Sequence, residues 1–309
     1  MRVRFLLAGV FFALTGCVTM DHSAPTTRRE VKDENQVVQK EDSAPRKRLM
    51  ILPFLDSGEQ RPQELRDRAR VAFIQDLNRS GDVIAIDSRE LNLDLSKMME
   101  GGQYKLVEVA KAAQALGVNA VLEGKINDIR IKRKTDNVGL VRHLTTVFEV
   151  VAQVRVVTAR TGKEVFNTIK TVTVEDQGVR VAERVETDRY LQNNPDLVGV
   201  IVKDAFLDFS QQVLNSLGKV SWEGRIAAIN GDRLYLNVGK VSGLQMGDLL
   251  KVVDEGDDVY DPENGTHIGR VPGRLKGTLE VISYFGTDGS IAIIHSGAGF
   301  KENDRVELY

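Results

Sequence analysis

The residue with the clearest capacity for chemistry is Cys17, the single cysteine among 309 residues. Its thiol could act as the nucleophile that forms a thioether with lipid, because sulfur in its thiolate form is the reactive species. The small residues Thr15 and Gly16 come directly before it and would let a peptidase reach the bond that precedes Cys17. An exported chain with one cysteine has no internal disulfide partner. The pattern therefore predicts lipid attachment at Cys17.

The segment before Cys17 has the pattern of an export signal. Arg2 and Arg4 form a short positive region, and an apolar stretch follows as far as Leu14. This stretch is shorter than the roughly 20 residues of a membrane-spanning helix and suits the apolar core of a signal peptide. We therefore predict a signal peptide over residues 1–16. An ordinary secretory signal followed by an incidental cysteine is the alternative.

The run Leu14-Thr15-Gly16-Cys17 resembles the lipobox of bacterial lipoproteins. The resemblance implies acyl chains, palmitate among them, on Cys17, and several chains hold a protein at a membrane far better than one. In such lipoproteins an Asp after the acylated cysteine usually signals inner-membrane retention, and Val18 occupies that position here. Outer-membrane lipid is thus the expected partner of Cys17. The expected location is lipid-anchored, on the periplasmic side of the outer membrane.

The composition and the segment after Cys17 say less about partners. A formal net charge of −2 gives no reason to expect nucleic acid. Residues 17–47 are polar, contain Pro25 and Pro45 and mix charges of both signs, which predicts a lipidated, disordered tether. A flexible chain of that length has a root-mean-square reach of about 30 Å. The rest of the chain is long enough for about two domains.

Residues 48–217 alternate between strand patterns and helix patterns. This alternation predicts an α/β domain: a mixed sheet with packed helices, and antiparallel strands added to a parallel core. The expected elements are strands at 48–54 and 83–86, a helix starting at Pro62 and stopped by Ser80-Gly81, a helix at 106–116 capped by Gly117, strands from Ala120 to Asp176 and one long helix at 196–217.

Several segments of this domain resemble the curli-secretion lipoprotein family, CsgG. The family's core is similar to the N-terminal domain of TolB and to the middle domain of the flagellar protein FlgT. The resemblance covers residues 48–217 and implies this fold and assembly into a ring of subunits. Its motifs mark turns and strands and imply no catalytic residues. They are Ile51-Leu52-Pro53-Phe54, Ser80-Gly81-Asp82-Val83, and the segments at 115–124 and 154–165.

Residues 218–309 carry short strand patterns separated by glycine turns. Six or seven such strands without a helical period predict a small all-β, SH3-like barrel. Within it, residues 243–250 parallel residues 299–306, and Gly247 and Asn303 stand at the matching place, where a positive φ is tolerated. The domain resembles the C-terminal barrel of FlgT, including the hairpin at 259–269. The predicted strands are 225–229, 234–238, 249–253, 267–271, 278–284, 291–294 and 305–308.

No catalytic, cofactor or metal site is predicted. The sequence has no Gly-x-Ser-x-Gly nucleophile elbow and no phosphate-binding glycine loop before a helix. The four histidines lack metal-ligand spacing and are expected on the surface or on strands. Calcium at an acidic loop over residues 254–263 is an alternative to a solvated hairpin tip. The histidines are His22, His143, His267 and His295, and the loop carboxylates are Asp254, Glu255, Asp257, Asp258, Asp261 and Glu263.

The family resemblance implies a second functional alternative, a CsgG-type oligomeric outer-membrane channel for curli-like subunits. In the regions that match the family's two membrane hairpins, charges interrupt the apolar faces: Arg133 follows Ile129 and Ile131, and Arg142 lies between Leu140 and Leu144. A charge on a lipid-facing strand is unfavourable by up to a few kcal/mol. We therefore expect a non-enzymatic scaffold or assembly factor for an envelope apparatus, flagellar or fibre-secreting, for which a homo-oligomeric ring is one form. The second hairpin shows the same interruption, with Asp176 after Val172 and Val174, and Glu183 after Val179 and Val181.

Overall fold

The computed structural model describes residues 45–58, 61–136, 143–176, 195–271 and 273–309. The predicted signal peptide, Cys17 and almost all of the predicted tether lie outside the described residues. The described residues belong to one compact unit, Ala44–Tyr309. Within them, no helix combines the length and the apolar character that crossing a membrane requires.

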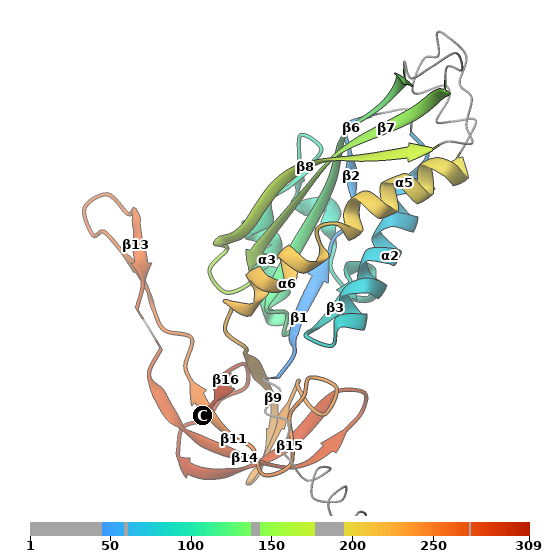
Figure 1. Cartoon of the computed structure of the whole chain (residues 1–309). Helices are drawn as coiled ribbons and strands as arrows, with labels where there is room; N and C mark the ends of the chain where they lie inside the picture. Colours follow the sequence, from blue (N-terminus) through green and yellow to red (C-terminus); the bar gives the residue numbers. More distant parts are fainter. Residues whose placement is uncertain (1–44, 59–60, 137–142, 177–194, 272) are drawn as a thin grey trace, which may run out of the picture. The chain divides into compact units, whose positions relative to one another are not determined.

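A mixed sheet forms the centre of the α/β part (Figure 1), with the strand order β3-β1-β6-β7-β8. Strand β1 (Lys47–Ile51) pairs in parallel with β3 (Val83–Asp87) and β6 (Ala120–Asp136). Strands β7 (His143–Thr158) and β8 (Glu164–Asp176) extend the sheet by antiparallel pairing. The predicted fold, a parallel core with antiparallel additions, is confirmed.

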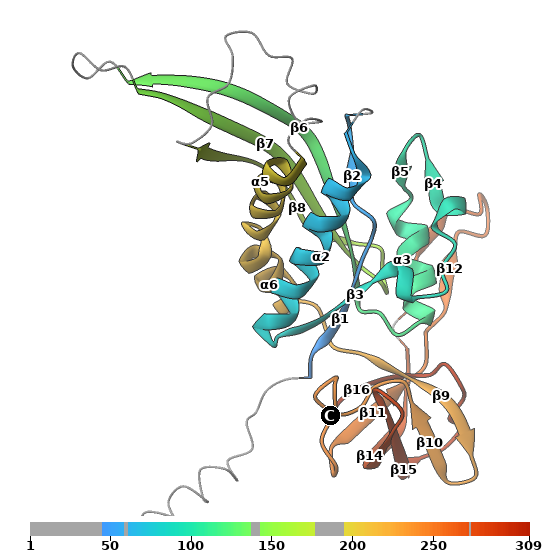
Figure 2. The same cartoon turned by 90° about the vertical axis from the view of Figure 1, so that its right-hand side faces the viewer.

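Helices cover both faces of this sheet (Figure 2). Alternate strand residues point to opposite faces, so Leu49 and Leu122 join one apolar cluster while Met50 and Val121 join another. The first cluster packs against three helices and the second packs against one. The three helices are α2 (Gln63–Ser80), α5 (Pro195–Leu207) and α6 (Ser210–Gly218), and the single helix is α3 (Leu106–Ala115).

The ends of α2 follow from its sequence. Pro62 stands at the N-cap, where a missing N–H costs no helical hydrogen bond. Gly81 ends the helix with φ +80°, a conformation that glycine adopts without strain. Leu65, Phe73 and Leu77 lie on its buried side. The helix predicted from Pro62 to Ser80-Gly81 is confirmed.

The single helix predicted at 196–217 is wrong, because the structure has two helices with a break at Asp208 and Phe209. At the break, the N–H of Phe209 donates to the carbonyl of Phe206 at 3.0 Å, a tighter turn than that of an α-helix. Both phenylalanines are fully buried, and Phe206 stacks on Phe54 with ring centroids 4.3 Å apart. Both aromatic rings therefore enter one core at the break. Helical spacing alone does not reveal such a break.

Short elements not predicted from the sequence complete the α/β part. Strand β2 (Leu55–Asp56) pairs in parallel with β6, and a small hairpin precedes α3. Strand β2 pairs with β6 beyond the end of β1, whereas the hairpin forms a separate two-stranded sheet. The hairpin strands are β4 (Met99–Glu100) and β5 (Gln103–Tyr104), preceded by the 3-10 turns η1 (Ser88–Glu90) and η2 (Leu95–Met98).

Six antiparallel strands form a closed barrel at the C-terminal end, in the order β10-β15-β14-β11-β16-β9. The predicted all-β barrel is confirmed. Its interior holds Leu234, Leu250, Leu279, Ala292 and Val306, all fully buried. The strands are β9 (Gly224–Asn230), β10 (Arg233–Leu236), β11 (Leu249–Val253), β14 (Leu275–Phe285), β15 (Gly289–Gly297) and β16 (Arg305–Leu308).

One predicted barrel strand, 267–271, is wrong. The ladder passes directly from β11 to β14, with Val253 opposite Leu275, so the chain between them leaves the barrel. That chain forms a separate two-stranded hairpin of β12 (Asp258–Tyr260) and β13 (His267–Arg270) (Figure 1). Because a closed barrel has no free edge, the extra strands can only lie outside it.

The predicted internal repeat of the barrel, in which residues 243–250 parallel residues 299–306, is confirmed by the backbone conformation at its matching positions. Gly247 has φ +88° and Asn303 has φ +72°. In each copy the next residue is an Asp whose Oδ2 accepts a backbone N–H three residues earlier, at 2.7 Å: Asp248 from Gln245, and Asp304 from Lys301. The same turn therefore leads into β11 and into β16.

Candidate functional site

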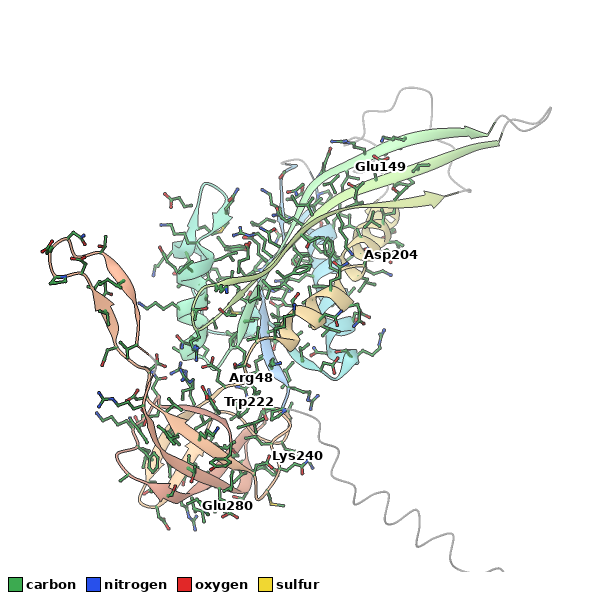
Figure 3. The ribbon with its side chains drawn as sticks, turned by 60° about the vertical axis from the view of Figure 1, so that its left-hand side comes forward. Arg48, Glu149, Asp204, Trp222, Lys240 and Glu280 are labelled. Carbon is green, nitrogen blue, oxygen red and sulfur yellow. The ribbon has the colours of Figure 1, made fainter. Side chains whose placement is uncertain are left out.

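Hydrogen bonds join the α/β part to the barrel at one junction. The Oδ1 of Asn119 accepts the N–H of Arg48 at 2.7 Å, and its Nδ2 donates to the carbonyl of Glu223 at 2.9 Å. The guanidinium of Arg48 in turn donates to the carboxylate of Asp288 at 2.7 Å. Figure 3 shows Arg48 and Trp222 at this junction. These contacts connect residues of the sheet to residues of the barrel and its preceding segment.

A buried ion network lies at the carboxyl end of β3. The side chain of Arg70 is fully buried and donates to Asp87 at 3.2 Å and to Asp67 at 3.0 Å. Burial lowers the pKa of Arg70, and the two carboxylates oppose that effect. Burial acts to raise the pKa of Asp87, but hydrogen bonds from Arg89 hold it below its ordinary value. These charged side chains pair with one another and thereby hold α2 against β3.

Glu123 is a second buried carboxyl, on the face of β6 that packs toward α3. Burial raises its pKa, although Arg155, 3.4 Å away on the neighbouring strand β7, acts in the opposite direction. Burial and the negative charge of Glu123 also raise the pKa of Tyr104 to about 12. The Tyr104 hydroxyl donates to the carbonyl of Pro53 at 3.1 Å. Each of these groups has a structural partner, so the geometry favours a role in stability.

An open cleft of about 870 Å³ lies between α3, the turn from β7 to β8, and the outer face of β11 and β16. Its size falls within the range of ligand pockets, about 300–1,000 Å³. The base of the β12–β13 hairpin forms a further wall, through Tyr260 and Val271. Val107, Lys111 and Gln114 line it from α3, spaced so that they share one side of the helix. This cleft is the candidate functional site.

The cleft was not predicted from the sequence. Its lining comes from five segments that the fold brings together, and no single segment carries a motif. One signal was present: α3 has an apolar residue, Val107, on its outward side, where it is 63% exposed. Val271, at the end of the predicted strand 267–271, is exposed at the cleft.

The acidic loop expected as a calcium alternative does not gather its carboxylates. Asp254 accepts the N–H groups of Gly256 and Arg274, and Glu255 pairs with Arg225. Asp261 lies near the hairpin tip and accepts the N–H of Glu263 at 2.8 Å. Within the described part of the chain, no three His, Cys, Asp or Glu residues converge on a point that a metal ion could occupy.

None of the three histidines that the structure describes lines the cleft. His143 begins β7, His267 begins β13 and His295 is exposed on β15. His22 and Cys17, the predicted acylation site, lie outside the described residues.

No protein-family model matches the chain, and no curated protein matches its sequence. Three solved structures are similar to it in part. A hypothetical protein from Chlamydia trachomatis is 15% identical, with 56% of this chain and 98% of that chain covered at a TM-score of 0.35. A lipoprotein from Neisseria meningitidis is 15% identical, with 55% and 99% covered at 0.28.

The third is the PelC dodecamer from Paraburkholderia phytofirmans, which is 12% identical, with 54% of this chain and 89% of that chain covered at a TM-score of 0.31. All three TM-scores are below 0.5, so these similarities support no conclusion about this chain. The CsgG and FlgT resemblances remain expectations from the sequence.

Proposed function

We propose that this chain is a lipoprotein that is anchored to the outer membrane on its periplasmic side through Cys17. There it acts as a non-enzymatic scaffold or assembly factor for a flagellar or fibre-secreting envelope apparatus. The observation that carries the proposal is the export signal followed by Leu14-Thr15-Gly16-Cys17. An acylated cysteine would fix the start of the chain to a lipid leaflet and leave the folded part to act by contact.

The features of the described residues support a protein that acts by binding partner proteins. Its buried charges, such as Arg70 with Asp87 and Glu123 with Arg155, are paired within the fold. The cleft, in contrast, combines exposed apolar side chains with positive charges, the composition of a binding surface. A scaffold protein needs such a surface for binding its partners, and the cleft supplies one.

Labelled palmitate and membrane fractionation test the anchor. In a Gram-negative host, we expect the full chain to incorporate palmitate and to fractionate with the outer membrane, and the Cys17→Ser variant to do neither. Thr19→Ser is the matched control and should behave like the original chain. If Cys17→Ser still fractionates with membranes at an unchanged apparent mass, the anchor proposal is wrong.

A channel is the second candidate, because β6 has 17 residues and β7 has 16, beyond the roughly 9–11 that a membrane strand needs. One face of this pair packs into the core, and the opposite face carries charged side chains. Ile129 is buried in the core, and Lys132 pairs with Glu149 at 2.7 Å on the opposite face. Other residues of the expected membrane hairpins, at 137–142 and 177–194, lie outside the described residues. The scaffold is therefore the better supported proposal.

Conductance measurements separate the two candidates. A scaffold predicts that the purified mature chain without its acyl chains stays in solution without detergent and produces no conductance steps in planar lipid bilayers. Reproducible steps from that chain, which are lost on substituting residues of the β6–β7 hairpin, would support the channel instead.

A further inference from the structure

Exposed apolar side chains gather at the cleft. Val107 on α3, Tyr260 and Val271 on the hairpin, and Leu275 at the start of β14 each expose half or more of their surface. Large apolar residues are common singly on protein surfaces, but a group around one hollow marks a site of binding. The apolar part of the cleft would therefore be covered by a ligand with apolar side chains.

The charges in the cleft are unbalanced. Its two acidic residues are already neutralised, because Glu255 pairs with Arg225 and Glu307 pairs with Arg305 at 2.8 Å. Three of its cations have no ion pair within the described ranges: these are Lys111, Arg160 and Lys251. Lys251 instead lies over the ring of Tyr309, 5.1 Å from its centroid. The cleft thus carries positive charge that an acidic partner would complement.

We propose that the cleft binds an extended, acidic segment of a partner protein, with carboxylates meeting Lys111, Arg160 and Lys251 and apolar side chains covering Val107 and Leu275. The adjoining hairpin favours an extended segment. In the described structure β12 pairs only with β13, so the outer edge of each strand is open to a further strand. The inference deepens the proposed function and rests on it, since it names the chemistry of the scaffold's partner.

Fluorescence anisotropy with a defined probe tests the proposal. The probe is a fluorescein-labelled peptide, Asp-Val-Glu-Leu-Asp-Val-Glu-Leu, titrated with the full chain carrying Cys17→Ser, which cannot be acylated. We expect saturable binding that weakens as salt is raised, because charge attraction is screened. A peptide with Lys in place of its acidic residues, and one with Ser in place of Val and Leu, should each bind at least about tenfold more weakly.

Variants locate the binding. We expect Lys111→Glu with Lys251→Glu to reduce affinity at least about tenfold, and Leu275→Ser to reduce it severalfold, since both change exposed or half-exposed side chains. The matched control is Lys219→Glu with Lys240→Glu, two exposed lysines outside the cleft, which should leave affinity unchanged. Circular dichroism melting curves would check that each variant is folded.

Three results would overturn the proposal. They are equal binding of the acidic and basic peptides, equal loss of affinity in the cleft and control variants, and binding of phosphatidylglycerol vesicles through the same lysines without binding of the acidic peptide. The last result would assign the cleft to a lipid surface. None of them affects palmitate incorporation at Cys17, so failure here is distinguishable from failure of the anchor.

Discussion

Arg48 and Asp288 are 240 residues apart in the sequence, yet the guanidinium of one donates to the carboxylate of the other at 2.7 Å. Arg48 belongs to the first strand of the mixed sheet, and Asp288 lies in the turn between β14 and β15. Asp288 also accepts the N–H of Ser242 at 2.9 Å. Both charged side chains are about seven-eighths buried. This ion pair therefore couples the sheet to the barrel.

Substituting Arg48→Gln should destabilise the chain by about 1–3 kcal/mol, because it leaves a buried carboxylate with one partner fewer. Chemical denaturation followed by circular dichroism would measure the change. The control is Arg130→Gln. Because the Arg130 side chain is 60% exposed, this substitution should lower the free energy of unfolding by less than about 1 kcal/mol. Equal effects of the two substitutions would show that the Arg48–Asp288 pair does not stabilise the fold.

Arg70→Met should be more damaging, with an expected loss of about 3–5 kcal/mol. The side chain of Arg70 is fully buried, and its removal takes a partner from both Asp87 and Asp67. Arg79→Met is the control, because Arg79 is 79% exposed on the same helix. A loss below about 1 kcal/mol for Arg70→Met, measured by the same denaturation, would contradict the network described at β3.

Acid sensitivity should depend on Asp87. Its pKa is lower in the folded chain than the value of about 3.9 in an unfolded chain, so the unfolded state binds the proton more readily. Its contribution to stability is present above pH ~4 and is lost as the pH falls through the folded pKa. Asp87→Asn should flatten the stability curve in that acid range and lower stability at neutral pH. An unchanged slope below pH ~4 would contradict this assignment.

The repeated turn of the barrel gives a test of backbone conformation. Gly247 has φ +88° and open space around the position of a Cβ, so Gly247→Ala should cost about 1–2 kcal/mol from the backbone alone. Gly247→Asn should cost less, because Asn303 holds the matching place in the other copy. Gly218→Ala, at the end of α6 without a positive φ, should cause no loss. Equal costs for Ala and Asn at position 247 would contradict the equivalence of the turns.

Val18 should determine the membrane in which the chain resides. If the chain follows the sorting pattern of bacterial lipoproteins, Val18→Asp should move it to the inner membrane without changing palmitate incorporation. Sucrose-gradient separation of the two membranes would show the shift, with Val18→Ile as the control. Retention of Val18→Asp in the outer membrane would contradict the proposed location.

Local signals in the sequence were enough to predict most of the framework. Pro62 and Gly81 mark the ends of α2, and alternating apolar residues mark the buried face of β7, from Phe148 to Val156. Positive φ at Gly247 and Asn303 followed from a short repeat. These features depend on backbone preferences and on burial patterns that neighbouring residues carry themselves.

Features that depend on distant partners could not be predicted in this way. At the break between α5 and α6, Phe206 packs on Phe54 from another segment, and Arg70 is buried beside Asp87. The cleft likewise needs Val107 and Leu275, which are distant in the sequence, to line one hollow. A sequence pattern indicates the backbone conformation and the burial that each residue favours, but it does not indicate which distant residue that residue will contact.

Mass spectrometry of the intact chain extracted from membranes tests the central claim most directly. We predict a mature chain that begins at Cys17 and carries the added mass of acyl chains on that residue. A chain that retains residues 1–16, or one that begins at position 17 with an unmodified thiol, would contradict the lipid anchor from which the proposed function follows.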